Sequence, residues 1–420
     1  MRRFLVPALL AVACSRPAPH GDFTLRMAVV GPLASLRHDT HDTATVYAQD
    51  LVYEPFFRPE GMGFTSRVFT SWERGAGRGI RALVADGLKF SDGSPVEVGD
   101  VVRSLRAGGL AVQAEGRRIE VEPGQSGLPV DAALLMTLLF KATPAGDLGT
   151  GAFRLSSQDE RRLAVERVRP AVGKIGRVEL VSFATTREAL AEVLKGKVNA
   201  VTSLDDRQAE LLEGVPSLRL VRTRGPHALA VVLNSHRLDR RTRREISEAL
   251  PLEEIGELSQ GKSCGPTPWP RRPGALSAGD PLDVSVGGTD APVERAGLAL
   301  RRGLGGRGGR IARLSGGEPR DALTRQPLMV ANTLVWPPAV GALYWKTNGL
   351  FNTTGYSNPA YDAAVEAGDF ERAEAELKKD PPALLLCRRE RIAAVDSRIK
   401  NATLGSWGYL DTLPDWEVSP

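Results

Sequence analysis

The stretch LKFSDGSPVEVGDVVRSL, residues 88–105, combines turn chemistry and helix signals in one place. Its first residues alternate apolar and polar as in a short strand, and Gly93 can supply the positive φ of the turn that follows. Ser94 and Glu97 have the spacing of a capping box around Pro95, and the later apolar residues repeat with the helical period. The stretch therefore predicts a strand, a turn and a helix that begins at Pro95.

The same residues resemble a signature of the family 5 extracellular solute-binding proteins, the peptide, nickel and glycan receptors of ABC importers. The matching positions are Phe90, Ser91, Asp92, Gly93, Pro95, Asp100 and Val101. In that family the helix is usually capped at the position of Glu97, three residues later than the local signals indicate. A second stretch, FNTTGYSNPAYDAAVEAGD at 351–369, matches the family very closely, and weaker matches spread over nearly the whole mature chain.

The resemblance implies an α/β fold of the type II periplasmic-binding-protein kind, with two lobes and an extra small subdomain in the first lobe. Strand and helix patterns that alternate at 178–201 and 282–314 agree with an α/β fold. The expected divisions are 1–14 as a lipoprotein signal peptide, 15–21 as a tether, 22–50, 146–225 and 395–420 as the core of lobe I, 51–145 as the inserted subdomain, and 226–394 as lobe II.

The N-terminus predicts export. Arg2 and Arg3 precede an apolar run at 4–12, which is short of the roughly 20 residues of a membrane span. The run ends in AVAC, residues 11–14, which resembles a bacterial lipobox and implies that Cys14 carries a lipid. We expect a periplasmic protein anchored to a membrane of the cell envelope. Ordinary cleavage after small residues, or a start codon assigned too late, is the alternative.

With Cys14 lipidated, two cysteines remain, Cys264 and Cys387. An even pair in an oxidising compartment favours a disulfide. The alternative is two isolated thiols, with Cys387 buried in the apolar run at 383–387. Because no Cys-x-x-Cys spacing occurs, structural zinc is not expected.

Composition and motifs argue against several functions. The formal charge is only +5, and the arginines are spread without interleaved aromatics, unlike a nucleic-acid surface. No motif of a serine hydrolase or zinc protease stands in a suitable context, so we expect neither an enzyme nor a cofactor. His38 and His41 have a spacing that can hold a metal, although this polar segment also suits a helix lead-in.

The ligand site follows from the resemblance alone. In this family the ligand lies between the lobes, and peptide binders often carry Trp-x-x-Asp, whose Asp receives the peptide amine. Here the corresponding residues are 336–339, Trp-Pro-Pro-Ala, without a carboxylate. Since a buried ammonium without a partner is costly, ordinary peptide recognition is not expected. The candidate contacts, each with packing as the alternative role, are Trp336, Tyr344, Trp345, Asn348, Tyr53 and Asn234.

The resemblance thus implies a monomeric substrate-binding lipoprotein of an ABC importer. It would capture a peptide-like or other small polar solute between its lobes and deliver it to the permease subunits. A degenerate relative that no longer transports, and acts as an envelope sensor or interaction protein, is the alternative. Ala152, Asn199 and Ala339, which depart from the family pattern, and a shortened first lobe favour that alternative.

Overall fold

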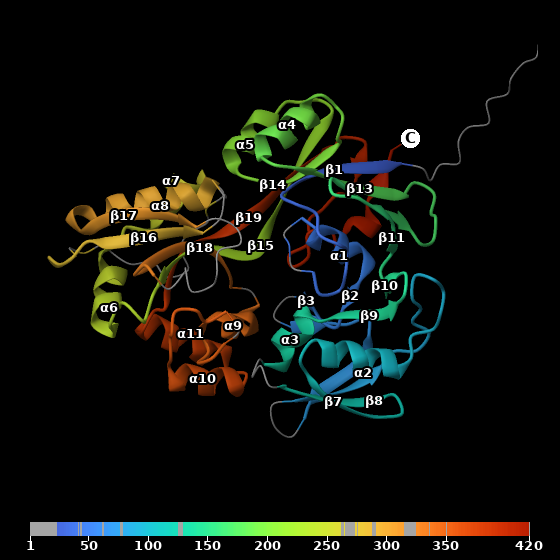
Figure 1. Cartoon of the computed structure of the whole chain (residues 1–420), viewed down its shortest axis with the longest axis horizontal. Helices are drawn as coiled ribbons and strands as arrows, with labels where there is room; N and C mark the ends of the chain where they lie inside the picture. Colours follow the sequence, from blue (N-terminus) through green and yellow to red (C-terminus); the bar gives the residue numbers. More distant parts are fainter. Residues whose placement is uncertain are drawn as a thin grey trace, which may run out of the picture.

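The computed structural model describes residues 23–419, apart from 41, 43, 61–62, 76–78, 125–128, 262–263, 265–273, 275, 288–290, 315–324, 336 and 350. Two bodies, lobe I and lobe II, share one ten-stranded sheet (Figure 1). Two long antiparallel strands in its middle, β15 (Leu218–Leu233) and β19 (Ala383–Asp396), connect the lobes. Their pairing shifts register between Arg224 and Ala228. The predicted two-lobed α/β fold is confirmed.

Lobe I is built around β1, which pairs in parallel with β13 and β14. Helices α4 and α5 pack on one face of this sheet, and α1 with the C-terminal segment packs on the other, where Trp416 is completely buried. Its elements are β1 (Thr24–Val30), α1 (Val46–Val52), β11 (Phe153–Gln158), β12 (Arg162–Arg167), β13 (Arg177–Phe183), α4 (Thr186–Leu194), β14 (Ala200–Leu204), α5 (Asp206–Leu212), β20 (Ile399–Lys400), η5 (Leu413–Asp415) and β21 (Glu417–Val418).

The small subdomain packs α2 and α3 on a four-stranded sheet of order β5-β6-β8-β7, with Phe56 and Phe57 in its core. Its elements are β2 (Glu54–Pro55), β3 (Arg58–Glu60), β4 (Gly63–Thr65), β5 (Phe69–Arg74), β6 (Ile80–Val84), α2 (Val98–Ala107), β7 (Ala111–Glu115), β8 (Arg118–Glu122), α3 (Val130–Met136), β9 (Leu138–Thr143) and β10 (Gly146–Gly149).

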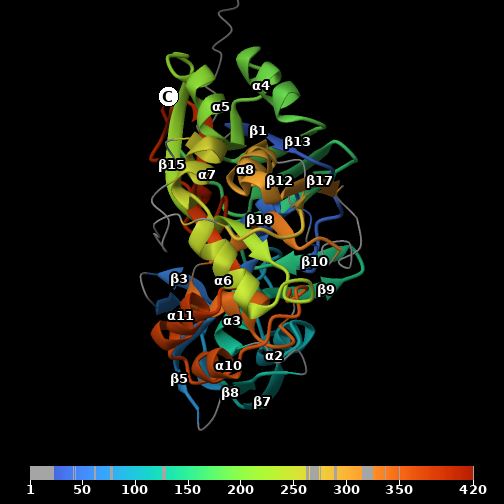
Figure 2. The same cartoon turned by 90° about the vertical axis from the view of Figure 1, so that its left-hand side faces the viewer.

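Lobe II places helices on both faces of its part of the sheet. Helices α7 and α8 lie on one face, and α10 and α11 on the other (Figures 1 and 2). Its elements are α6 (Arg240–Ala249), α7 (Leu252–Gln260), β16 (Leu282–Gly287), α8 (Ala291–Gly303), η2 (Gly305–Arg307), β17 (Gly308–Leu314), β18 (Leu328–Leu334), η4 (Pro338–Gly341), α9 (Ala342–Trp345), α10 (Pro359–Glu366) and α11 (Phe370–Lys379).

The local prediction for residues 88–105 is wrong at two points. The helix begins at Val98, because Asp100 accepts a 3.1 Å hydrogen bond from the backbone N–H of Glu97. Ser94 is unavailable as a cap, since both its N–H and its hydroxyl bond to Asp92 Oδ1, at 2.8 and 2.7 Å. The expected strand is reduced to a single bridge between Lys89 and Pro95. The family pattern placed this helix better than local signals did.

A disulfide joins Cys264 to Cys387 on β19, with Cα atoms 5.2 Å apart. Its sulfur leaves no room at Gly256 on α7, where an added Cβ would lie 2.6 Å from Cys264 Sγ. The proposed signal peptide, the tether and Cys14 lie outside the described residues. In the part of the chain that is described, no helix is long and apolar enough to cross a membrane.

Candidate functional site

A pocket of about 260 Å³ lies on lobe II between β18 and helix α9. It adjoins Gly287, the last residue of β16, and so lies beyond the carboxyl end of that strand, where open α/β sheets usually receive ligands. We call it the junction pocket. Its described lining consists of Val232, Gly287, Met329, Ala331, Asn332, Thr333, Tyr344, Trp345, Phe351, Thr353 and Thr354.

The wall of this pocket is also the contact between lobe II and the small subdomain. Val340 on η4 and Leu343 on α9 are completely buried in the same apolar cluster as Phe56 and Phe57. Tyr344, and Phe351 in the loop after α9, face the pocket and pack against that cluster as well. A solute in the pocket therefore touches side chains whose position depends on how the lobes meet.

The signature at 351–369 holds this wall in place. Gly355 has a φ of +67°, and an added Cβ there would lie 2.2 Å from the ring of His236, so glycine is required. Asn358 caps α10 by accepting bonds of 3.0 and 3.2 Å from two backbone N–H groups of its first turn. Asp362 accepts a 3.0 Å bond from the N–H of Thr347, which fixes the loop after α9 to α10.

Two of the predicted contact residues, Tyr344 and Trp345, line the junction pocket. Their ring centroids are 5.7 Å apart, and Tyr344 is 5.4 Å from the ring of Phe351. Burial raises the pKa of Tyr344, so its hydroxyl stays protonated at neutral pH. These three rings make an aromatic wall with a hydroxyl on it.

The other predicted contacts that the structure describes lie elsewhere. Asn348 is exposed in a turn with a φ of +60°, and Tyr53 is buried in the core of lobe I. Asn234 donates to the carbonyl of Gln326 at 2.9 Å and accepts from the N–H of His236 at 3.0 Å, so its amide organises a turn. Trp336 lies outside the described residues. The structure therefore brings together two of the six.

Several pocket residues escaped the sequence reasoning, above all Met329, Asn332 and Thr333 on β18. The signal that could have found them is the polar pair Asn332-Thr333 inside an otherwise apolar strand. Asn332 also connects the pocket to β19, because its Oδ1 accepts a 3.0 Å bond from Arg389 of that strand.

The lining favours an uncharged solute with some apolar surface. Among the described lining residues there is no aspartate, glutamate, lysine, arginine or histidine, and the polar groups are one amide and several hydroxyls. Ala339, which replaces the acidic residue of the peptide-binder pattern, is 1% exposed. A charged amine would find no counter-ion in this lining, which would make its burial costly.

Strand β19 is fixed to the C-terminal segment by the half-buried side chain of Arg391. Arg391 of β19 donates to three backbone carbonyls of residues 405–408, at 2.6–3.0 Å, and stacks over Tyr409 with its guanidinium carbon 4.1 Å from the ring centroid. Burial lowers the pKa of nearby His227 to about 3, helped by Arg391 and Arg389. This histidine is neutral at physiological pH.

The fold is shared with solute-binding proteins of known structure. DppA from Helicobacter pylori in complex with the peptide STSA matches with a TM-score of 0.74 and 12% identity over 96% of this chain and 99% of its own. AppA from Bacillus subtilis with a nonapeptide gives 0.73 and 13% over 96% and 100%. NikA from Staphylococcus aureus with Ni(L-His)2 gives 0.73 and 12% over 94% and 100%.

The predicted resemblance is confirmed at the level of the fold. The structural neighbours are the peptide and nickel receptors that the two signatures resemble, and the match covers nearly the whole chain. No family model and no curated protein matches the sequence. At these identities the likeness shows the fold, and the solute has to be argued from the chain's own residues.

Of the two histidines whose spacing can hold a metal, the structure describes His38. His38 Nδ1 lies 2.7 Å from Asp147 Oδ2, and its ring stacks on Phe140 with centroids 3.4 Å apart. His41 is outside the described residues. Where the chain is described, no cluster of three or more His, Cys, Asp or Glu side chains is arranged to hold a metal.

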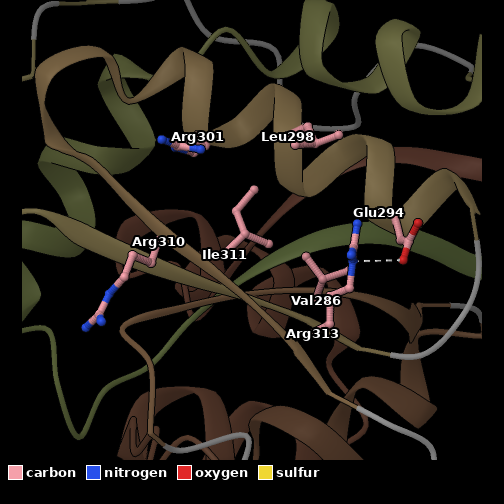
Figure 3. A pocket seen from close by; sticks show the side chains of 7 residues that line it. All are labelled: Val286, Glu294, Leu298, Arg301, Arg310, Ile311 and Arg313. Atoms are coloured by element: carbon pink, nitrogen blue, oxygen red, sulfur yellow. Dashed lines mark ion pairs between the residues drawn. The ribbon is translucent and has the colours of Figure 1, made fainter.

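A larger hollow of about 430 Å³ lies on the outer flank of lobe II, between α8 and the edge strand β17 (Figure 3). Arg301, Arg310 and Arg313 surround it, and Arg313 pairs with Glu294 at 3.2 Å. Leu298 at its rim is 57% exposed. This hollow is lined by four charged side chains, and none of its described lining residues belongs to the apolar cluster at the lobe contact, so we place the site in the junction pocket instead.

Proposed function

We propose that this chain is the solute-binding component of an ABC importer and that it holds its solute in the junction pocket. The observation that carries the proposal is the double role of Tyr344 and Phe351. Both line the pocket, and both pack against the cluster of Phe56 and Phe57 in the other lobe. An occupant that positions these rings therefore favours one arrangement of the lobes, which is how a ligand biases hinge closure.

The solute is a small, uncharged molecule with an apolar part and a few hydrogen-bonding groups. The three rings supply apolar contact, and Asn332, Thr333 and Thr353 supply an amide and hydroxyls. The related structures bind other things, a peptide in DppA and nickel with histidine in NikA. Their ligands carry charge, whereas the described lining here has no charged group to receive it.

The chain works as a monomer in the periplasm, lipid-anchored through Cys14 after signal-peptide cleavage, and passes its solute to permease subunits. The lipobox-like AVAC at 11–14 supports the anchor, and the neighbours that serve ABC importers support the permease. The comparisons do not favour the alternative of a non-transporting sensor.

The test is native mass spectrometry of the protein purified from its own envelope, followed by small-angle scattering with the solute that it identifies. We expect a bound uncharged solute and a smaller radius of gyration when it is added back. Ala331→Leu, which fills the junction pocket, should abolish both effects. Asn348→Gly is the control, since it removes an exposed side chain and tolerates the positive φ. An empty protein that co-purifies with another protein would contradict the proposal.

A further inference from the structure

A second cavity of about 260 Å³ lies inside lobe II, beneath helix α11. Its walls include Gly341, Trp345, Tyr361, Leu377, Leu385 and Arg388. Trp345 separates this α11 cavity from the junction pocket, because it lines both. An engineered apolar cavity of about 150 Å³ is known to hold benzene, so this one has room for an aromatic ring and a short side chain.

One polar group in these walls points to a ligand. Tyr361 is 2% exposed, and an added Cβ at Gly341 would lie 3.5 Å from its hydroxyl oxygen. Within the described part of the chain, nothing hydrogen-bonds that hydroxyl. The hydroxyl oxygen is not fully enclosed by protein atoms, so it can donate to an acceptor on a molecule bound in the cavity. Burial raises the pKa of Tyr361, so the hydroxyl remains a donor.

The second polar group gives the sign of the ligand's charge. Arg388 of β19 is half-buried in the same wall, where it donates to the carbonyl of Gly225 at 3.3 Å. Burial, together with the charge of Arg224, lowers its pKa, as expected for a cation in apolar surroundings. Glu374 also borders the cavity, but it is exposed and pairs with Lys378 at 2.9 Å. Arg388 therefore brings a positive charge to the inner wall of the cavity, whereas Glu374 lies at its exposed border.

We propose that the α11 cavity binds a small aromatic carboxylate, with the ring against Trp345 and Leu377 and the carboxylate accepting from Tyr361 and Arg388. The planar guanidinium suits a carboxylate, and its charge excludes amines. The site goes beyond the proposed solute pocket, because lobe II alone forms it and no closure is needed. A ligand in the α11 cavity would contact Trp345, which also lines the junction pocket, and would therefore affect binding there.

The probe is 3-phenylpropionate, titrated calorimetrically into the full mature chain. We expect saturable binding with one site. Binding of 3-phenylpropan-1-ol should be about tenfold weaker, since it lacks the charge-assisted hydrogen bonds, and 2-phenylethylamine should not bind.

Matched variants show whether the probe binds in the α11 cavity. Gly341 has a helical φ of −56°, so Gly341→Val is tolerated by the backbone and places methyl groups among Tyr361 and Trp345. It should weaken binding at least about tenfold, as should Arg388→Gln. Arg372→Gln on α11, outside the cavity lining, makes the same charge change and should leave affinity unaltered.

Tyr361→Phe gives a readout that a packing role does not predict. Removing a hydroxyl that bonds no described group of the chain should leave the melting temperature unchanged or raise it, while affinity for 3-phenylpropionate falls about fivefold. Two results would overturn the proposal: no saturable binding at millimolar probe, or binding that survives Gly341→Val and is lost in Ala331→Leu. The second would place the probe in the junction pocket. Neither result bears on whether the chain delivers a solute to a permease.

Discussion

Two stretches of the chain resemble family signatures, and they differ in what they do. Residues 88–105 lie in the small subdomain, where their polar groups bond one another, Asp92 with Ser94 and Asp100 with Glu97. Residues 351–369 run from the wall of the junction pocket into α10 and fix the loop after α9. The first signature marks a scaffold, and the second supports the candidate site. A recognisable motif does not by itself say which of these it is.

The largest expected effect comes from exchanging one glycine in each stretch for alanine. At Gly355 the positive φ of +67° and the His236 ring both oppose a Cβ, so Gly355→Ala should lower the free energy of unfolding by about 3 kcal/mol. At Gly93 the φ is +88°, but nothing lies within 4 Å of an added Cβ. Gly93→Ala should therefore cost only about 1 kcal/mol, the strain of the backbone.

Urea denaturation of both variants measures this difference. Equal losses would show that His236 moves aside freely, and the contrast in packing between the two stretches would not hold.

The comparison also shows where sequence reasoning succeeds. Within 178–201, where strand and helix patterns alternate, the helix is present as α4, and Thr185 caps it by accepting a 3.2 Å bond from the N–H of Glu188. The start of such a helix is determined by residues close to it in the sequence. At residues 88–105 two capping arrangements compete over three residues, and the bonds of Ser94 to Asp92 and of Glu97 to Asp100 decide between them. Local spacing cannot rank the two.

The candidate site is harder to predict because its residues come from separate elements. The aromatic pair Tyr344 and Trp345 was found because it comes shortly after residues 336–339, where the family carries its Trp-x-x-Asp pattern. Asn332 and Thr333 approach this pair only when β18 is placed in the sheet. Tyr53 and Asn234 have residue types that suit a ligand site and a core equally well. The structure places the first in a core and the second in a turn.

The next effect in size concerns acid stability and contrasts Asp92 with Asp50 on α1. Burial and the nearby Asp411 raise the pKa of Asp50 to about 6, although its carboxylate accepts from the N–H groups of Tyr409 and Leu410. The folded state then holds a proton more tightly than the unfolded state, so stability should fall by about 2 kcal/mol as pH rises from about 4 to 6. Asp50→Asn should remove this slope.

Asp92 has the opposite sign. Hydrogen bonds from Ser94 lower its pKa, so its contribution is present at neutral pH and is lost as the solution becomes acidic below about pH 4. Urea denaturation of the Asp50→Asn and Asp92→Asn variants from pH 3 to 7 separates the two. If Asp50→Asn leaves the slope between pH 4 and 6 unchanged, Asp50 is already charged in the folded state.

The smallest effect distinguishes scaffold from site through the two helix caps. Asn358→Ala and Asp100→Ala each remove an acceptor at a helix start, and each should cost about 1 kcal/mol in urea denaturation. Asn358 also bonds the N–H of Tyr361, whose hydroxyl faces the α11 cavity. Asn358→Ala should therefore weaken 3-phenylpropionate binding about threefold, whereas Asp100→Ala should not change it. Equal affinities in the two variants would mean that packing alone positions Tyr361. The second signature would then support the junction pocket only, through the bond from Thr347 to Asp362.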